Sequence, residues 1–168
     1  MGRPPGRVPF HETKGPSARD IRVALEGAKR LDEIERRHIP SEHLAEVRAI
    51  QRRMLDSKNM DLAWRVEETP DGHPIVRASV SPLDEASINA GHVLHDYTIE
   101  RQPRAVKLIY EKDSRFRGPQ DIRKVGSDII LSDNAEIVTW DAKSPDEAGR
   151  IFHREVGNLI GRLKQHAE

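Results

Sequence analysis

Three residues in the C-terminal half could form a catalytic site: Asp128, Asp141 and Lys143. Residues 129–131 and 136–143 resemble two short strands, and the Ser-Asp-Asn segment between them favours a hairpin turn. Antiparallel pairing about this turn would bring Asp128 diagonally close to Asp141. Strand alternation would place Asp141 and Lys143 on one face. We therefore expect two carboxylates and one amine to converge at one point.

This combination suits phosphodiester hydrolysis. Mg²⁺ takes oxygen ligands and keeps some of its waters, so two carboxylates supply a suitable partial shell. A bound Mg²⁺ lowers the pKa of its water and neutralises charge on phosphoryl oxygens. A lysine two residues from a metal ligand can stabilise the anionic transition state or orient the nucleophile.

The composition excludes several other classes of chemistry. The 168 residues include no cysteine, which excludes disulfides, thiolate metal sites and cysteine nucleophiles. The length suits one domain with a helical extension. No run approaches the roughly 20 apolar residues of a membrane helix, and residues 1–15 lack the apolar core of a signal peptide. We expect a soluble chain that does not bind a membrane.

Charge is balanced overall but unevenly distributed. The 28 Lys and Arg equal the 28 Asp and Glu, which argues against a broadly basic nucleic-acid binder. Residues 101–124 hold eight basic and three acidic residues, whereas residues 125–168 hold five basic and eight acidic ones. A basic segment beside an acidic hairpin suits an anionic substrate. The residues expected to hold flanking phosphates are Arg115, Arg117, Arg123 and Lys124.

The N-terminal half predicts a helical pair and a hairpin. Residues 1–16 are rich in Pro and Gly and are expected to be a flexible arm or linker. Apolar residues three or four apart predict helices over 17–38 and 41–57. A Pro-Asp-Gly-His turn predicts a β-hairpin over residues 62–80.

The C-terminal half predicts an α/β (α+β) core. Ser81-Pro82 opens a helix expected to end at Gln102-Pro103, with an apolar stripe that includes Ala90 and Tyr97. The elements expected after it are a strand over 105–111, a basic loop over 112–124, the hairpin described above, and a helix from Pro145. The order of elements in this core is α-β-β-β-α. The expected division of the whole chain is an arm (1–16), a helical pair and hairpin (17–80) and this core (81–168).

This element order and the Asp141-Ala142-Lys143 triplet resemble the PD-(D/E)xK nuclease superfamily, which has the restriction-endonuclease-like fold. The resemblance implies that Asp128 and Asp141 bind Mg²⁺ or Mn²⁺, that the Ala142 carbonyl is a further ligand, and that Lys143 is the catalytic lysine. Glu85 fits the glutamate that many members carry near the start of the helix before the sheet. Ser127 stands where the family motif has proline.

Two positions in the motif have rivals. Asp121 is an alternative to Asp128 as the first acid, and Glu100 is an alternative to Glu85 as the helix acid.

The function implied is a magnesium-dependent nuclease that acts on DNA or RNA. Small families of this fold are frequent as toxin domains of bacterial contact-dependent and polymorphic systems, so a cognate immunity protein is an expected partner. Such a toxin would be secreted or delivered into a target cell, and otherwise the chain would be cytoplasmic. The alternatives are a non-catalytic protein-binding module, such as an immunity or adaptor protein, and a degenerate nuclease fold kept for nucleic-acid binding.

Each candidate also has a purely structural interpretation. Asp141 and Lys143 could be the solvated face of a strand whose other face, with Val138 and Trp140, is buried. A carboxylate such as Glu85 is favoured in a first helical turn whatever the function. A metal pair at His92 and His95 has no evident third ligand.

Overall fold

The computed structural model describes residues 15–115 and 135–168. The chain divides into two compact units, Met1–Glu33 and Ile34–Glu168. The described part of the first unit is most of helix α1 (Ala18–His38), which confirms the first predicted helix. Ser17 and Asp20 begin it as a reciprocal cap, since the Asp20 N–H donates to Ser17 Oγ at 3.1 Å. The expected arm falls outside the described residues except for residues 15 and 16.

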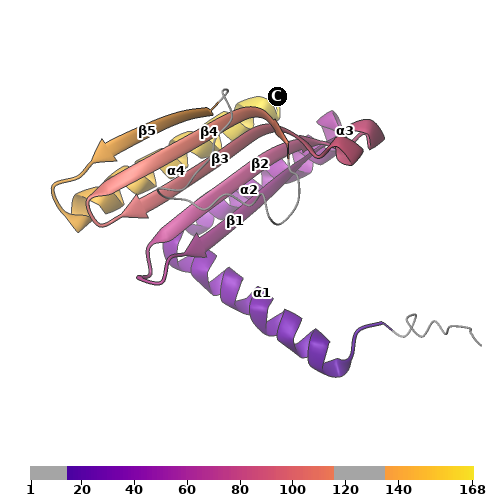
Figure 1. Ribbon diagram of the computed structural model, residues 1–168, viewed down its shortest axis with the longest axis horizontal. Helices are drawn as coiled ribbons and strands as arrows, with labels where there is room; N and C mark the ends of the chain where they lie inside the picture. The colour runs from indigo at the N-terminus through magenta and orange to yellow at the C-terminus, as the bar shows by residue number, and fades with distance from the viewer. Residues whose placement is uncertain (1–14, 116–134) are drawn as a thin grey trace, which may run out of the picture. The chain divides into compact units, whose positions relative to one another are not determined.

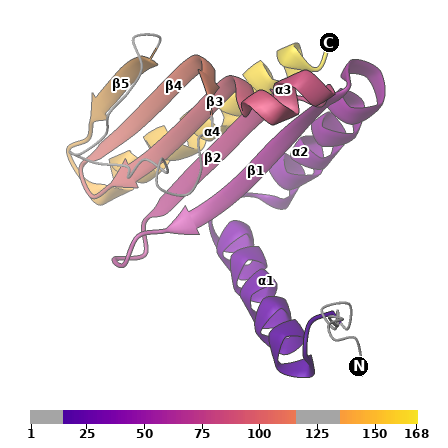
Figure 2. The ribbon, with the colours of Figure 1, turned by 45° about the vertical axis from the view of Figure 1, so that its right-hand side comes forward.

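The second unit is built on a five-stranded antiparallel sheet whose strands pair in chain order (Figure 1). Figure 2 shows β1 and β5 at its opposite edges. The strands are β1 (Met60–Glu68), β2 (Pro74–Pro82), β3 (His92–Gln102), β4 (Ala105–Arg115) and β5 (Ala135–Asp141).

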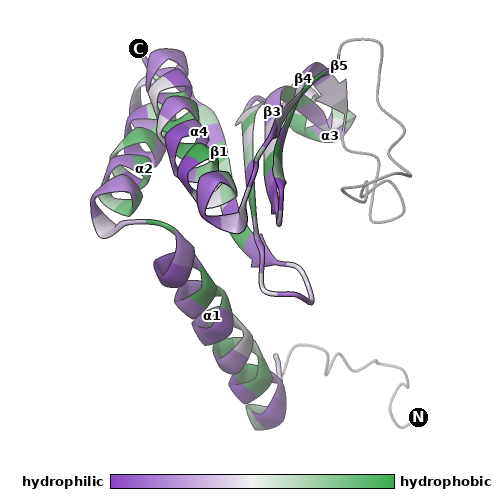
Figure 3. Ribbon diagram, turned by 90° about the vertical axis from the view of Figure 1, so that its left-hand side faces the viewer, coloured by the Kyte–Doolittle hydropathy of each residue, from purple (hydrophilic) through white to green (hydrophobic). Residues whose placement is uncertain are grey.

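Helices cover one face of this sheet. α2 (Ser41–Arg53) continues into a π-helical turn, Met54–Lys58, and lies beside α4 (Pro145–His166) on that face (Figure 3). α2 contacts β1, while α4 contacts β3 and β4. The core between the layers is mainly aliphatic and includes Val47, Val76, Ile99, Phe152 and Leu163, all at most 1% exposed.

Local signals explain why these elements begin and end where they do. In the β1–β2 turn, Gly72 has a φ of +83°, and the Thr69 N–H donates to the His73 carbonyl at 2.8 Å. At the start of α4, Ser144 Oγ accepts the Glu147 N–H at 3.2 Å, and proline occupies the first turn. Both features were predicted from the sequence and are confirmed.

The long helix predicted from residue 81 to 102 is wrong. Only α3 (Glu85–Ala90) is helical, and Gly91 ends it with a φ of +65°. Residues 92–102 form β3 instead, in which Tyr97 and Ile99 alternate into the core. The apolar spacing of three and four across residues 83–97 was therefore coincidental, because the stripe runs through a helix, its glycine cap and a strand.

This correction changes the expected core. The structure is α+β, but β4 is preceded by a strand and not by the first helix of the expected α-β-β-β-α order. The expected boundary between residues 80 and 81 is also wrong as a structural division, because β2 and β3 pair within one sheet. The basic loop expected over 112–124 begins within β4, and its residues 116–124 lie outside the described part. The predicted strand over 129–131 lies there too.

Gly91→Ala tests the corrected boundary. Alanine strains the left-handed backbone, so we expect the free energy of unfolding to fall by about 1 kcal/mol in urea denaturation. The matched control is Gly161→Ala on α4, where an added Cβ meets nothing within 4 Å. That change should stabilise by about 0.5–1 kcal/mol. Equal effects of the same sign would contradict the assignment.

Candidate functional site

The Asp141-Ala142-Lys143 triplet lies where β5 leads into α4. Asp141 is the last residue of β5, and Lys143 lies in the bend before α4. Both side chains are exposed, whereas Ala142 between them is 9% exposed. This alternation agrees with a shared face for Asp141 and Lys143.

Glu85 lies at the opposite end of the sheet from Asp141. α3 leads into His92, which pairs with Arg115, whereas Asp141 pairs with Ala105 at the other end of β4. Ten residues of strand separate those ends, or about 33 Å. Glu85 and Asp141 are therefore not brought together.

The rival acid Glu100 is nearer to Asp141. It lies on β3 and is 7% exposed, with Lys107 opposite it on β4 and Thr139 opposite Lys107 on β5. Its Oε1 accepts a hydrogen bond from Gln102 at 3.0 Å.

Of the other predicted site residues, one lies far from the triplet and the rest are outside the described part of the chain. Arg115 is the last residue of β4, at the end remote from Asp141. The remaining ones lie outside the described residues: Asp121, Asp128, Arg117, Arg123 and Lys124. Within residues 15–115 and 135–168, no three His, Cys, Asp or Glu side chains are grouped to hold a metal ion. The described residues therefore do not complete a shell for Mg²⁺.

Strand β5 presents an open edge instead. Ile137 and Val138, which point to opposite faces, are 48% and 44% exposed. The alternative interpretation of the triplet as the solvated face of a strand is therefore wrong in one respect, because it has Val138 buried. Trp140 is half-buried, and the Arg154 guanidinium carbon lies 5.8 Å from its ring centroid. In the described part of the chain, no strand pairs with the outer edge of β5.

The backbone of β5 shows which groups face outward. The Ala142 N–H donates to the Arg104 carbonyl at 2.8 Å, so this position faces β4. Because donors alternate along an antiparallel strand in continuous register, Val138 also bonds to β4. The N–H groups of Ile137 and Thr139 therefore face outward.

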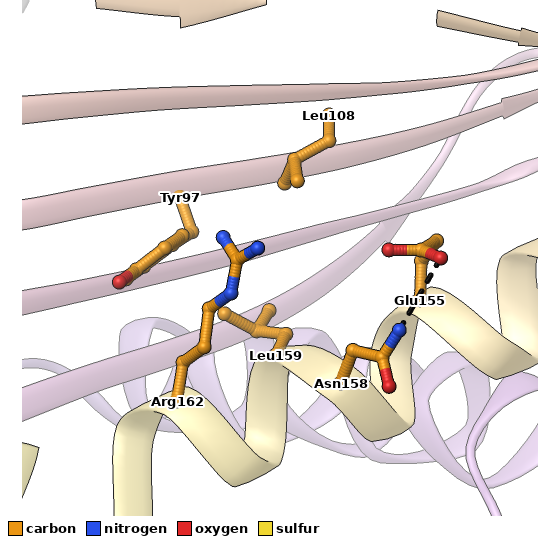
Figure 4. A pocket seen from close by; sticks show the side chains of 6 residues that line it. All are labelled: Tyr97, Leu108, Glu155, Asn158, Leu159 and Arg162. Atoms are coloured by element: carbon orange, nitrogen blue, oxygen red, sulfur yellow. Dashed lines mark hydrogen bonds between the residues drawn. The ribbon is translucent and has the colours of Figure 1, made fainter. Parts of the chain in front are cut away.

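A shallow crevice lies between α4 and the sheet (Figure 4). Glu155, 7% exposed, accepts hydrogen bonds from Arg154 Nε at 2.9 Å and Asn158 Nδ2 at 3.3 Å. The Arg162 side chain extends from α4 toward the sheet beside Tyr97. The carboxylate is thus neutralised within the helix itself.

One cluster of titratable side chains was missed in the sequence: His95, Tyr97, Tyr110 and His166. His95 Nδ1 lies 2.8 Å from the Tyr110 hydroxyl, and His166 Nε2 lies 2.8 Å from the Tyr97 hydroxyl. The two imidazoles stack with centroids 3.8 Å apart. Burial is the largest cause that lowers the pKa of His166 to about 4 and raises the pKa of Tyr97 to about 12. We name these four side chains the ring cluster.

A sequence signal for part of this cluster existed. His95 and Tyr97 are two residues apart, which places them on one face of a strand. The helical interpretation of residues 81–102 concealed this relation and suggested a pair of His92 with His95. On β3 those two histidines are three residues apart, so they do not share a face. His92 contacts a different group, since its Nε2 lies 3.3 Å from Asp113 Oδ1.

No family model, curated protein or solved structure matches the chain. Its helices, as far as they are described, include none with the length and apolarity needed to cross a membrane. A function for this chain therefore has to be inferred from its own residues.

Substitutions in the triplet should separate folding from function. Asp141→Ala and Lys143→Ala should leave the urea midpoint unchanged, because both side chains are exposed. Ala142→Asp between them should lower the free energy of unfolding by on the order of 2 kcal/mol, since it buries a carboxylate without a partner. A large loss in the two exposed variants would show that these residues are structural.

Proposed function

We propose that this protein is a non-catalytic protein-binding module that assembles by strand addition, with β5 as its docking edge and a second copy of the chain as its partner. The observation that supports this is the exposure of side chains on both faces of β5, together with an outer edge that no other described strand pairs with. Four consecutive residues, 136–139, are exposed, and two of them are large and apolar.

In the described part of the chain, the edge shows few of the features that normally prevent pairing. Natural edge strands are blunted by proline, by charged side chains and especially lysine, by bulges or by coverage from another element. β5 contains no proline or lysine, its two charged side chains are Glu136 and Asp141, and its register with β4 is continuous from Ala135 to Asp141. Among residues 15–115 and 135–168, no strand pairs with the outward backbone groups of Ile137 and Thr139, so these groups are available for a further strand.

β5 is complementary to itself in an antiparallel register centred on Val138. In that register Ile137 faces Thr139 of the other copy, which is a favourable pair of β-branched residues. Val138 faces Val138, and Glu136 faces Trp140. Asp141 faces Ala135, so no carboxylate faces another carboxylate. The outward N–H groups fall in the hydrogen-bonded pairs that this register requires.

Thr139→Pro tests this pairing. The change removes an outward N–H without removing a bond to β4, so we expect a dimer in the wild type and a monomer in the variant. Because a seven-residue strand pair is small compared with permanent interfaces, the dimer should depend on concentration. Analytical ultracentrifugation over a concentration series measures this mass.

The matched control is Thr139→Ala, which keeps the N–H and should keep the dimer. Ile88→Lys on α3 changes another exposed apolar residue, 56% exposed, and should also leave the mass unchanged. A wild type that stays monomeric at every concentration, or a Thr139→Pro variant that still dimerises, would contradict the proposal. Circular dichroism checks that each variant is folded.

A second candidate function is the metal-dependent nuclease with a restriction-endonuclease-like core. Its support is the exposure of Asp141 and Lys143 on either side of Ala142, immediately before α4. In this proposal the substrate is DNA or RNA and the partner is a cognate immunity protein. Asp141 would bind the ion and Lys143 would stabilise negative charge on the phosphoryl group.

Cleavage assays distinguish the two candidates. Plasmid DNA, genomic DNA and total RNA would be incubated with the protein in Mg²⁺, in Mn²⁺ and in EDTA. As a binding module, the wild type should cleave none of them. Cleavage that is lost in EDTA and in Asp141→Ala, but kept in Glu136→Ala, would instead support the nuclease. Glu136 is a suitable control because it is an exposed acid on the same strand.

A further inference from the structure

The ring cluster joins the last turn of α4 to the middle of the sheet. His95 and Tyr97 come from β3, Tyr110 comes from β4 and His166 comes from α4. The stacked imidazoles have planes only 11° apart, and the Tyr97 and Tyr110 rings lie 4.7 Å apart. Two hydroxyl–imidazole hydrogen bonds complete a closed arrangement of four rings.

This arrangement favours neutral histidines. Two imidazolium rings at a centroid distance of 3.8 Å would repel each other, and their partial burial would limit screening by water. A neutral imidazole nitrogen can also accept a hydrogen bond from its tyrosine hydroxyl, whereas a protonated nitrogen can only donate to the hydroxyl oxygen.

The surrounding charges do not offset this repulsion. Lys112 on β4 and Arg162 on α4 are the basic side chains that act on the cluster, and both disfavour protonation of a histidine. Asp113 on β4 favours protonation of His95, but this carboxylate is half-exposed and pairs with His92. Glu136 on β5 acts on Tyr110. The nearby basic groups therefore oppose a second positive charge in the cluster.

We propose that the His95–His166 pair is an acid-sensitive latch, which holds the last turn of α4 on the sheet while both rings are neutral and releases it when they are protonated. Release would uncover Leu163 and Ala167, which are 0% and 1% exposed. The latch is independent of the partner proposed for β5.

The direction of the pH effect follows from the depressed pKa values. Burial lowers the pKa of both histidines below the ordinary value of 6.5, to about 4 for His166. The unfolded chain therefore binds more protons than the folded chain between pH 6.5 and 4. The contribution of the pair to stability is complete above pH 6.5 and is lost as the pH falls toward 4.

Hydrogen exchange of the full chain, read by mass spectrometry at pH 7 and pH 4 and corrected for intrinsic rates, tests the latch. The peptide that covers residues 160–168 should lose protection by about tenfold or more at pH 4. Peptides from α2 should keep theirs. His166→Phe keeps a ring of similar size without a titrating group, so its C-terminal peptide should stay protected at pH 4.

The matched control is His153→Gln, because His153 also lies on α4 and also has a lowered pKa but is not part of the ring cluster. This variant should release the last turn as the wild type does. NMR titration of the wild type provides a measurement that needs no variant, and the His166 ring should titrate near pH 4. Titration of His166 near 6.5, or uniform loss of protection in α2 and α4, would overturn the proposal.

Discussion

The packing of α2 and α4 on one face of the sheet is the constraint on which the rest of the second unit depends. Packed helices lie 8–10 Å apart and strands about 4.8 Å apart, so two helices cover about four strands. α2 covers the β1 side and α4 covers β3 and β4. The fifth strand extends beyond the helical layer. This explains why Val138, which would otherwise point into the core, is 44% exposed.

Polar contacts fix the two sides of this layer. On the β1 side, Glu35 is 8% exposed and accepts hydrogen bonds from Arg48 at 2.9 Å and from Trp64 Nε1 at 2.8 Å. Removal of any one partner would leave a buried polar group unsatisfied, which costs about 1–3 kcal/mol. On the β3–β4 side, the ring cluster joins the end of α4 to the sheet. One side is thus held by a charge-assisted pair and the other by groups that must stay neutral.

The same topology separates two of the residues that suggested catalysis, Glu85 and Asp141. An antiparallel meander places consecutive turns at alternate ends of the sheet, so α3, between β2 and β3, lies at one end, and the β3–β4 turn lies at the other. Glu85 lies at the first of these ends and Asp141 at the second. Strand β5, in contrast, gathers exposed apolar side chains along one line, and no other described strand pairs with its outer edge.

The sequence by itself determined the elements whose signals are local: α1, α2 and α4 from their apolar periods and start residues, and the first hairpin from its Pro-Asp-Gly-His turn. It also identified β4 and β5. The helix predicted from Ser81-Pro82 was too long, because Gly91 ends α3 and was predicted to lie within the helix. Only the tertiary structure decided that Glu85 lies far from Asp141, since strand register sets that distance. It alone joined Tyr97 to His166, 69 residues apart in the chain, and left β5 outside the layer of described helices. These features depend on which surfaces meet across the core, and no spacing along the chain encodes that.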